Sequence, residues 1–509
     1  MSNESLERFL GLARQITQSK ESGSGARVVP VWRESLLDTD TPVTAYAKIR
    51  RGAFGFLLES APAGGETWAR YTYLGTEPRS AWRLRQGVVD EWTAHDGWHS
   101  RRTPEDPLAD LDAMIARSTP VDAPELGAFW SGAVGYFGYD VVRFIERLPH
   151  APAPSSSAPD ALFIFTRAMI IIDNLRSRAR IVVAVEVKPG DEESELRRLF
   201  DEADGEIREI ENRLKSPNPL PSLTLDPSSP AISATSSIER EDFIEKVEII
   251  REHIRAGDCF QALLSRRIET AADFDPTTLY RALRALNPSP YMYHLALDGV
   301  EIVGSSPELL VRLEGDRVTL RPIAGTRRRG ATALEDEELS RDLLADPKER
   351  AEHIMLVDLG RNDVGRVARY GTVQVTELMR IEKYSHVLHI VSQVEGSLDR
   401  ARTAMDVFRA TFPAGTMTGA PKVRAMEIID DLEPVSRGAY AGAIGFIAAG
   451  GSRMELAITI RTCVIADGVA SVQAGAGIVA DSVGEREWDE TSNKAGALLD
   501  AIAQARAAS

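Results

Sequence analysis

The sequence predicts a large α+β protein, and three observations support this prediction. Its 509 residues are too many for one ordinary hydrophobic core and suit two or three domains, or one large two-layered architecture. Hydrophobic residues make up 43% of the chain and charged residues 27%, which is typical of a globular protein. Stretches with the periodicity of a strand alternate along the chain with stretches that have the periodicity of a helix.

In the first part of the chain, strand and helix patterns are mixed. The alternation over 178–187 predicts a strand, and the charged stretch 191–215 predicts a helix. Residues 216–237 are rich in proline and serine and show neither periodicity, so we interpret them as a linker. We therefore expect an N-terminal region over 1–215 and a C-terminal region over 238–509.

The elements after the linker begin with a helix. Ser236 and Glu239 have the spacing of a capping box, which predicts the start of a helix that ends at Gly257. The sequence contains no internal repeat that we recognise. We expect further helices over 339–359, 403–412 and 485–508, and strands over 302–304, 318–322, 443–448 and 457–465.

The composition excludes several classes of protein. A net charge of −16 argues against nucleic acid or an anionic membrane surface as the main partner, because both bind clustered Lys and Arg. The start of the chain has no targeting pattern and the apolar stretch 161–173 is too short to span a bilayer, so we expect a soluble, cytoplasmic protein. The two cysteines, Cys259 and Cys463, form no disulfide framework and no metal-binding motif.

Four glutamates form two pairs with helical spacing. Glu349 and Glu352 are three residues apart, as are Glu487 and Glu490, so each pair shares one face of its predicted helix. Four converging carboxylates would repel one another unless a hard cation such as Mg²⁺ lay between them. The pattern therefore predicts a metal site, although the same spacing is common on solvated helix faces.

Glycine-rich turns and isolated polar residues indicate how an acid could be bound. In the segments 413–422, 438–446 and 473–482, glycine would let backbone N–H groups approach a carboxylate closely. Arg461 lies in the apolar run AITIRT, which predicts a strand in which the guanidinium needs a carboxylate partner. Ordinary tight turns, a structural ion pair for Arg461 and a core position for His389 remain the alternatives.

A series of short motifs runs through the second half of the chain. They include GDCFQALLSRR at 257–267, GSSPELL at 304–310, RPIAGTRRRG at 321–330, GTMTGAPKVRAM at 415–426, QAGAGIVADS at 473–482 and DETSNKA at 489–495. In this order they resemble the chorismate-utilising enzymes of the anthranilate synthase family, and LLES at 57–60 resembles the regulatory segment of that family. The resemblance implies an α+β fold in which two antiparallel β-sheets pack as a sandwich with helices outside.

The resemblance also implies the residues that bind metal and substrate. Glu352 and Glu490 match the direct ligands of Mg²⁺, and Glu349 and Glu487 match partners that act through metal-bound water. The substrate is expected to be chorismate, a dicarboxylate that this acidic chain must hold with local positive charge. The positions that match substrate-binding groups are Arg461, Tyr440, Gly475, Ala476, Gly477, Gly325 and Thr326.

Catalytic roles follow from the same resemblance. Glu308 matches the general acid that helps the C4 hydroxyl of chorismate to leave, and His389 and Thr416 match residues near this hydroxyl and the ring. Family members that add water have a lysine where this chain has Gln261, and members that form a covalent intermediate have a lysine where it has Ala324. Since both lysines are absent, we expect ammonia as the nucleophile, with anthranilate and pyruvate formed through aminodeoxyisochorismate.

Partners and regulation are implied as well. Neither cysteine lies in a nucleophile elbow, so ammonia would come from a separate glutamine amidotransferase subunit, in a homo- or hetero-oligomeric assembly. The reaction would be the first committed step of tryptophan biosynthesis, and tryptophan would inhibit it. The residues that match the tryptophan site are Glu59, Ser60, Arg70, Pro290, Tyr291 and Met292.

Two positions depart from the family pattern. Cys259 replaces an aliphatic residue, and Trp488 lies between the predicted metal-binding glutamates, where it could alter the packing near the metal. Two other functions stay open. The chain could form aminodeoxyisochorismate as its final product, without expelling pyruvate. It could also be a tryptophan-binding regulatory protein without activity, although Glu308 and Arg461 are both present.

Overall fold

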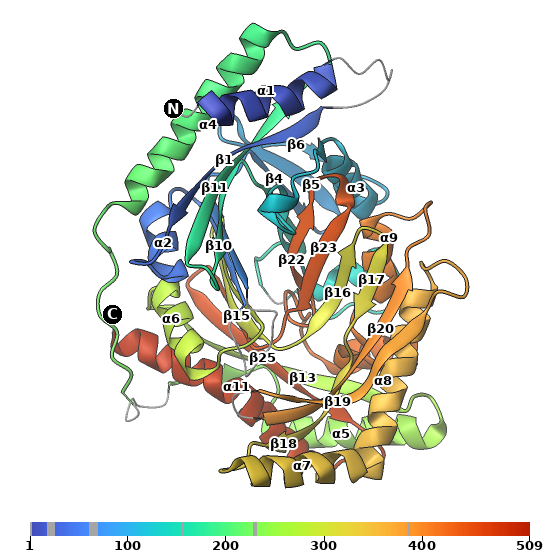
Figure 1. Ribbon diagram of the computed structural model, residues 1–509. Helices are drawn as coiled ribbons and strands as arrows, with labels where there is room; N and C mark the ends of the chain where they lie inside the picture. Colours follow the sequence, from blue (N-terminus) through green and yellow to red (C-terminus); the bar gives the residue numbers. More distant parts are fainter. Residues whose placement is uncertain are drawn as a thin grey trace.

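Two large, mostly antiparallel β-sheets pack against each other with helices outside (Figure 1), which confirms the predicted α+β fold. The computed structural model describes residues 3–17, 26–60, 70–154, 156–226, 232–384 and 387–508.

The first sheet has 13 strands, and all its pairs are antiparallel except that of β1 with β7. It runs from the β13 and β25 end near the bottom of Figure 1 to the β11 and β1 end at the top. Its order is β12 (Thr235–Ser236), β13 (Gln261–Ala271), β25 (Val469–Ile478), β24 (Thr462–Ala466), β15 (Val300–Ser306), β14 (Tyr291–Leu297), β2 (Phe54–Glu59), β3 (Tyr71–Thr76), β10 (Ala168–Asp173), β11 (Arg178–Val187), β1 (Arg27–Leu36) and β7 (Thr119–Pro120), with β21 (Gly419–Ala420) beside β13.

The second sheet has 12 strands and is antiparallel throughout. Its order is β18 (Ile323–Arg328), β20 (Val387–Ser397), β17 (Arg317–Leu320), β16 (Leu309–Glu314), β23 (Arg453–Ile458), β22 (Ala443–Ala448), β8 (Gly132–Phe137), β9 (Ala161–Phe165), β4 (Ser80–Arg85), β5 (Val88–Thr93) and β6 (Gly97–Arg102), with β19 (Gln374–Lys383) beside β20.

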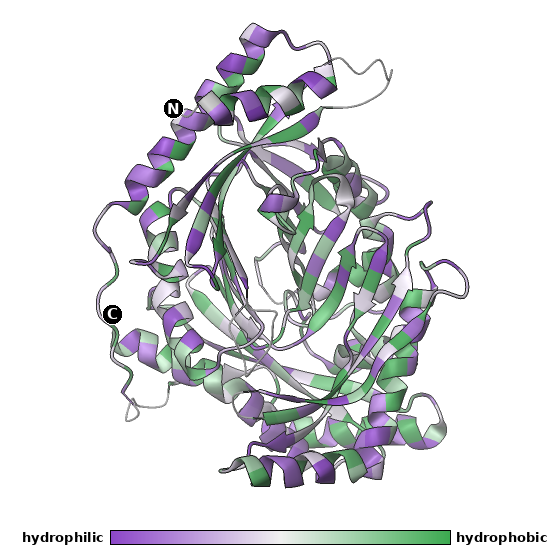
Figure 2. Cartoon of the chain, viewed as in Figure 1, coloured by the Kyte–Doolittle hydropathy of each residue, from purple (hydrophilic) through white to green (hydrophobic). Residues whose placement is uncertain are grey.

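Helices cover the outer faces of the sheets, with their apolar stripes turned inward (Figure 2). The α-helices are α1 (Asn3–Thr17), α2 (Pro42–Ile49), α3 (Pro107–Ala116), α4 (Glu193–Leu214), α5 (Arg240–Ala256), α6 (Pro276–Leu286), α7 (Ala333–Ala345), α8 (Pro347–Gly365), α9 (Ala404–Thr411), α10 (Lys422–Leu432) and α11 (Gly484–Ala507). Short 3-10 helices are η1 (Pro124–Leu126), η2 (Tyr139–Phe144), η3 (Gly415–Met417) and η4 (Ala449–Gly451).

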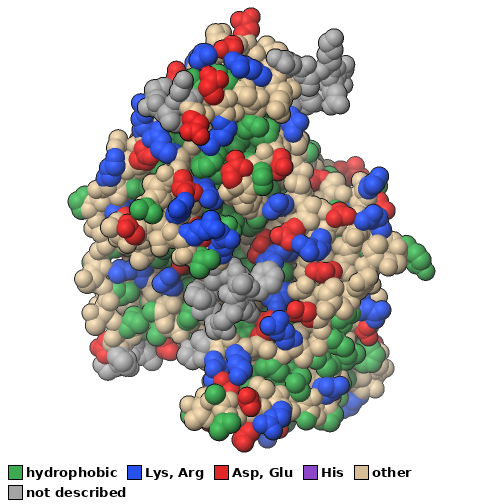
Figure 3. Space-filling model, in the orientation of Figure 1, with side chains coloured by type: hydrophobic (Ala, Val, Ile, Leu, Met, Phe, Trp, Pro, Cys, Tyr) green, Lys and Arg blue, Asp and Glu red, His purple; other side chains and the backbone are tan. Residues whose placement is uncertain are grey.

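The surface mixes charges of both signs. On the face drawn in Figure 3, Lys and Arg side chains lie among Asp and Glu side chains although the net charge is −16. In the described part of the chain, no helix combines the length and the apolar character that a membrane span requires.

Two of the expected helices differ from the structure, one in its continuity and one in how it begins. The single helix predicted over 339–359 is wrong, because Asp346 ends α7 and also caps α8, accepting hydrogen bonds from the backbone N–H groups of Lys348 and Glu349. The predicted capping box is also wrong, since Ser236 belongs to β12 and its hydroxyl donates to the carbonyl of Ile238.

The chain passes between the sheets at paired crossovers. Strand β15 of the first sheet leads into β16 of the second, and β23 of the second leads back into β24 of the first. Because β15 pairs with β24 and β16 with β23, the two crossovers lie side by side. The N–H of Ile458 donates to the carbonyl of Glu308 at 3.0 Å, and that of Ser305 to the carbonyl of Arg461 at 3.0 Å. The single strand predicted over 457–465 is therefore wrong, because the chain changes sheets within it.

The same strand order occurs a second time in the structure. In the N-terminal region β3 leads into β4 and β9 leads back into β10, and these strands pair as their C-terminal counterparts do. No internal repeat is recognisable in the sequence, since the duplication lies in the strand order rather than in residue identity. Residues 216–226 have no regular secondary structure, and both sheets contain strands from either side of them. The division into 1–215 and 238–509 stays a prediction.

We predict that Phe408→Ala in α9 lowers the free energy of unfolding by about 3–5 kcal/mol, because it removes a core aromatic ring. The side chain is fully buried, and its ring lies 4.0 Å from that of Phe137, centroid to centroid. Denaturant unfolding measures the effect. The fully exposed Tyr370 provides the control, since Tyr370→Ala should change this free energy by no more than about 0.5 kcal/mol. Equal effects of the two changes would contradict this account of the core.

Candidate active site

Glu308 lies at the crossover from β15 to β16 and has the properties of a general acid. Burial raises its pKa from 4.5 to about 7, while the Thr416 hydroxyl and the Lys494 ammonium oppose that rise. The Thr416 hydroxyl, in η3, donates to Oε1 of Glu308 at 3.0 Å. Glu308 borders a small cavity of about 50 Å³ whose other charged lining residues are Arg321 and Asp363. A carboxyl group with this pKa keeps its proton close to neutral pH and can transfer it.

Arg461 lies at the neighbouring crossover, outside a strand, with a positive φ of 52°. A non-glycine residue adopts this conformation at a cost, so its neighbours must hold it there. Its Nη1 donates to the carbonyl of Lys494 at 3.0 Å, and in the described ranges no carboxylate forms an ion pair with it. Burial lowers its pKa, and the nearby Tyr440 and Glu490 oppose that change. The guanidinium can therefore still bind a carboxylate bidentately.

The four glutamates of the predicted metal site lie on α8 and α11. Burial raises the pKa of Glu352, and the charges of Glu349 and Glu490 raise it further. Burial also raises the pKa of Glu487, again with a contribution from Glu490. The two helices thus turn carboxylates toward each other. Repulsion of this kind is what a bound cation relieves.

Two cations neutralise part of this acidic cluster. Lys494 Nζ lies 2.6 Å from Oε1 of Glu490, and Arg327 Nη1 lies 3.2 Å from Oε1 of Glu349. Among the residues that the structure describes, no three His, Cys, Asp or Glu side chains gather closely enough to hold a metal ion. The metal site stays a prediction, and the donor set of facing carboxylates fits a hard cation.

His389, in β20, faces β18. Its Nδ1 lies 2.9 Å from the carbonyl of Gly325 and 3.3 Å from the hydroxyl of Thr326. Burial lowers its pKa, so the ring is neutral near pH 7, and Nδ1–H donates to the carbonyl. The lone pair then lies on Nε2. A Cβ atom on Gly325 would lie 3.0 Å from Oε2 of Glu349, so this segment lies directly against the glutamate cluster.

Gln261 begins β13, opposite the glycines of β25. Its side chain is 6% exposed, and a Cβ atom on Gly477 would lie 2.6 Å from its Nε2. Its Oε1 is buried and has no hydrogen-bond partner in the described structure. The carbonyl of Gly475 accepts a hydrogen bond from Lys494 Nζ at 3.0 Å, whereas the side chain of Ala476 packs in the apolar core. The predicted residues from β13, β25, α8, α11 and both crossovers therefore surround one site.

Sequence reasoning assigned no role to Lys494, although it lies four residues after Glu490 on the same helix face. Its ammonium binds Glu490 and Gly475, and its carbonyl binds Arg461. The spacing of four residues between Glu490 and Lys494 was the signal in the sequence that could have identified this pair.

Trp488, which could have altered the packing near the predicted metal, packs against Phe243 and Arg266 instead. Its ring lies 5.6 Å from that of Phe243 in α5 and 3.8 Å from the guanidinium carbon of Arg266. Residues on a helix are about 100° apart, so Trp488 projects from a different face than Glu487 and Glu490.

The six residues predicted to bind tryptophan line one cavity of about 330 Å³ between the two sheets. Glu59 is buried there and accepts hydrogen bonds from Tyr280 at 2.8 Å and from Arg284 at 2.7 Å. Arg70 binds Asp173 at 2.8 Å. Tyr293 also lines this cavity, and its hydroxyl lies 2.6 Å from that of Thr462, the residue after Arg461. The predicted cavity residues, including Ser60, Pro290, Tyr291 and Met292, thus lie together, and their role stays a prediction.

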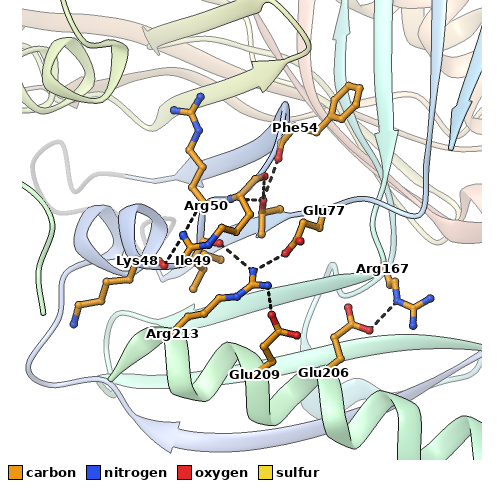
Figure 4. Close-up of polar contacts among 11 residues, drawn as sticks. Lys48, Ile49, Arg50, Phe54, Glu77, Arg167, Glu206, Glu209 and Arg213 are labelled. Carbon is orange, nitrogen blue, oxygen red and sulfur yellow. Dashed lines mark hydrogen bonds and ion pairs between the residues drawn. The ribbon is translucent and has the colours of Figure 1, made fainter. Parts of the chain in front are cut away.

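A second hollow, of about 650 Å³, lies at the N-terminal pair of crossovers against α4. Figure 4 shows that two of its arginines are already paired with carboxylates: Arg167 points to Glu206, at 2.8 Å, and Arg213 points to Glu77 and Glu209. Because these charges neutralise one another, we do not assign a site to this hollow.

We predict that Glu308→Gln reduces kcat by roughly 10²- to 10⁴-fold, the contribution of a general acid. It should also change the pH dependence of stability. The raised pKa means that protonated Glu308 contributes fully below about pH 4.5 and loses this contribution as pH rises through about 7. Denaturant unfolding should therefore show wild type losing stability relative to Glu308→Gln over this range.

Glu338 provides the control for this prediction. It is exposed on α7, so the difference in stability between wild type and Glu338→Gln should not change between the same pH values. If the difference in stability between wild type and Glu308→Gln does not change with pH either, Glu308 is ionised like an exposed carboxyl group.

Comparison with known proteins agrees with this geometry. Residues 69–500 match the family of chorismate binding enzymes. The chain is 43% identical to anthranilate synthase component 1 of Aquifex aeolicus over 494 residues, covering 97% of this chain and 98% of that one. It is 47% identical to anthranilate synthase component 1 of Pseudomonas putida, covering 94% and 96%.

A solved structure agrees as well. The crystal structure of anthranilate synthase component I from Streptococcus pneumoniae has a TM-score of 0.72 and 35% identity, covering 91% of this chain and 99% of that one. The matches to the two relatives and to this structure extend over nearly the whole chain. The chain therefore belongs to the chorismate-binding enzyme family and, within it, to the anthranilate synthase component 1 enzymes.

Proposed function

We propose that this chain converts chorismate and ammonia to anthranilate, pyruvate and water, through aminodeoxyisochorismate. The observation on which this proposal rests is the adjacency of a protonated acid, Glu308, and an arginine without a carboxylate partner in the described structure, Arg461, at two side-by-side crossovers. A substrate with two carboxylates and a poor leaving group needs both groups, because the acid protonates the leaving group and the arginine binds a carboxylate. The relatives named above support the same reaction, which we place in the cytoplasm as the first committed step of tryptophan biosynthesis.

Arg461 would bind one substrate carboxylate, with the buried Tyr440 beside it. The backbone from Gly475 to Gly477 would line the other side of the substrate. Glu308 would then donate its proton to the C4 hydroxyl, which leaves as water while the nucleophile attacks C2. The neutral His389, with its lone pair on Nε2, would accept the C2 proton when pyruvate is expelled.

Ammonia would be the nucleophile in this reaction. The described site has no lysine at the start of β13 or in the middle of β18, where Gln261 and Ala324 stand. The Oε1 of Gln261 is buried without a partner, so it can accept a hydrogen bond from ammonia and orient the lone pair. A separate glutamine amidotransferase subunit would supply this ammonia in the cell, as the term component 1 of the relatives suggests.

The facing glutamates would hold Mg²⁺, with Glu352 and Glu490 as direct ligands and Glu349 and Glu487 as outer partners. When bound, the ion would supply the positive charge that neutralises and fixes a substrate carboxylate. Lys494, which neutralises Glu490, would keep a positive charge between this cluster and the backbone at Gly475.

We further propose that tryptophan binds in the cavity between the sheets and inhibits the reaction. Glu59 would accept the ammonium group, and the apolar wall of Pro290 and Met292 would contact the indole. The hydrogen bond from Tyr293 to Thr462 connects this wall to the residue beside Arg461. A ligand that shifts β14 would thereby disturb the substrate-binding arginine.

In the decisive experiment, the purified chain is incubated with chorismate, Mg²⁺ and an ammonium salt at alkaline pH, and the products are followed by fluorescence and by their mass. We expect anthranilate and pyruvate in equal amounts, abolished by EDTA and by Glu490→Ala. Glu485→Ala, at an exposed glutamate of the same helix, should retain activity. Accumulation of aminodeoxyisochorismate would assign the truncated reaction, and tryptophan binding without turnover would assign a regulatory protein.

The proposed regulation predicts that Tyr293→Phe uncouples the two cavities. Without ammonia there is no turnover, so calorimetry can compare the tryptophan Kd with and without chorismate. The ratio of these values measures coupling, and we expect Tyr293→Phe to reduce it by roughly two- to thirtyfold. Tyr46→Phe is the control, because the Tyr46 hydroxyl is buried without a partner in the described structure. An unchanged ratio for Tyr293→Phe would exclude this connection.

A further inference from the structure

A fully buried ion pair lies beneath the candidate active site. Arg437 is 2% exposed and Glu433, at the end of α10, is 5% exposed. Arg437 donates from Nε to Oε2 of Glu433 at 2.9 Å and from Nη2 to Oε1 at 2.7 Å. Glu433 Oε1 also accepts from the backbone N–H of Ser265 at 2.8 Å and from its hydroxyl at 2.7 Å. Both charges are thus neutralised and hydrogen-bonded inside the protein.

The remaining donors of Arg437 hold two backbone segments of the site. Nη1 donates to the carbonyl of Met417 at 2.7 Å, and Nη2 donates to the carbonyl of Leu263 at 2.9 Å. Met417 directly follows Thr416, and Leu263 lies two residues after Gln261. The guanidinium carbon also lies 5.8 Å from the ring centroid of Tyr440. One side chain therefore contacts three of the segments that surround the proposed substrate.

Stability alone does not account for this arrangement. The desolvation of two buried charges offsets much of their attraction, and well-packed apolar residues often replace such a pair without loss of stability. An apolar side chain could not bind the two carbonyl oxygens, which would then be buried without partners. What the pair supplies is a fixed position for these carbonyls.

We propose that Arg437, oriented by Glu433, is a positioning residue that holds η3 so that the Thr416 hydroxyl reaches Glu308. This inference rests on the proposed function, because it assigns Glu308 as the acid of that reaction. Arg437 acts through Met417 and Thr416 and does not touch the substrate. Its shape matters as much as its charge, since lysine has no rigid fork to bind Glu433 and two carbonyls together.

The test is Arg437→Lys, read by the titration of Glu308. The hydrogen bond from Thr416 lowers the pKa of Glu308 against the effect of burial, so losing it should move the titration to higher pH. Lys494 is the charged group that acts on Glu308 from α11, and Arg321 and Asp363 line the same cavity. Infrared difference spectra between each enzyme and its Glu308→Gln counterpart would report the protonated carboxyl group without any turnover.

Three comparisons make the result specific. Thr416→Val removes the same hydrogen bond directly and should shift the titration in the same direction, and the Arg437→Lys, Thr416→Val double variant should add no further shift. Arg143→Lys is the matched control, because Arg143 also binds a carboxylate of α10, Asp430, at 2.9 and 3.0 Å, and its hydrogen bonds within the described ranges go to neither η3 nor β13. It should leave the titration of Glu308 unchanged. In turnover, Arg437→Lys should lower kcat by up to roughly 10²-fold with a smaller change in KM.

The outcomes separate this inference from the proposed function. If wild type does not turn over chorismate, the proposed function fails, and the infrared titration still tests the position of Thr416. If Arg437→Lys folds and Glu308 titrates as in wild type, the inference is overturned. If Arg437→Lys does not fold, Glu433→Gln gives the same test, since it keeps an acceptor for Ser265 and removes the charge that orients Arg437; a wild-type titration there also overturns it.

Discussion

The site depends on one topological constraint, the passage of the chain between two sheets at side-by-side crossovers. A residue inside either sheet has its backbone bound on both sides, whereas a residue at a crossover can project between the sheets. Glu308 and Arg461 both occupy such positions, and the backbone hydrogen bonds from Ile458 and Ser305 fix them there. The positive φ of Arg461 is the local consequence, because the chain must turn sharply to change sheets. The acid and the cation are thus placed by the strand pairing itself.

The duplicated topology shows that the crossover alone does not make a reactive site. In the N-terminal pair of crossovers Arg167 takes the place of Arg461, directly before its strand, but it binds Glu206 of α4 at 2.8 Å. In the C-terminal pair the helix that corresponds to α4 is α11, whose Glu490 binds Lys494 instead of Arg461. Lys494 takes up the carboxylate that would otherwise neutralise Arg461, the arginine that we propose binds the substrate. The two halves therefore share a framework, and the pairing of charges on one helix distinguishes them.

The sequence predicted the features that local periodicity determines. The strand over 178–187 and the helix ending at Gly257 are both confirmed, because each depends on neighbouring residues. The strand over 457–465 was wrong, since its apolar run continues through a change of sheets that only tertiary pairing determines. Arg437 and Glu433 escaped notice for a related reason: an i,i+4 ion pair is ordinarily solvated, and its burial depends on segments far away in the sequence.

The small cavity at Glu308 and the larger cavity between the sheets share part of their walls, so a change in one can affect the other. Leu309 and Arg321 line both the small cavity at Glu308 and the larger cavity between the sheets. Leu309 directly follows the acid, so a ligand that displaces it in one cavity must move the start of β16 in the other. Packed interiors respond to such displacement by moving whole elements, because they have few voids to absorb it. The proposed regulatory ligand would therefore need no long path through the protein, since the crossover that places Glu308 is itself a wall of the cavity proposed to bind it.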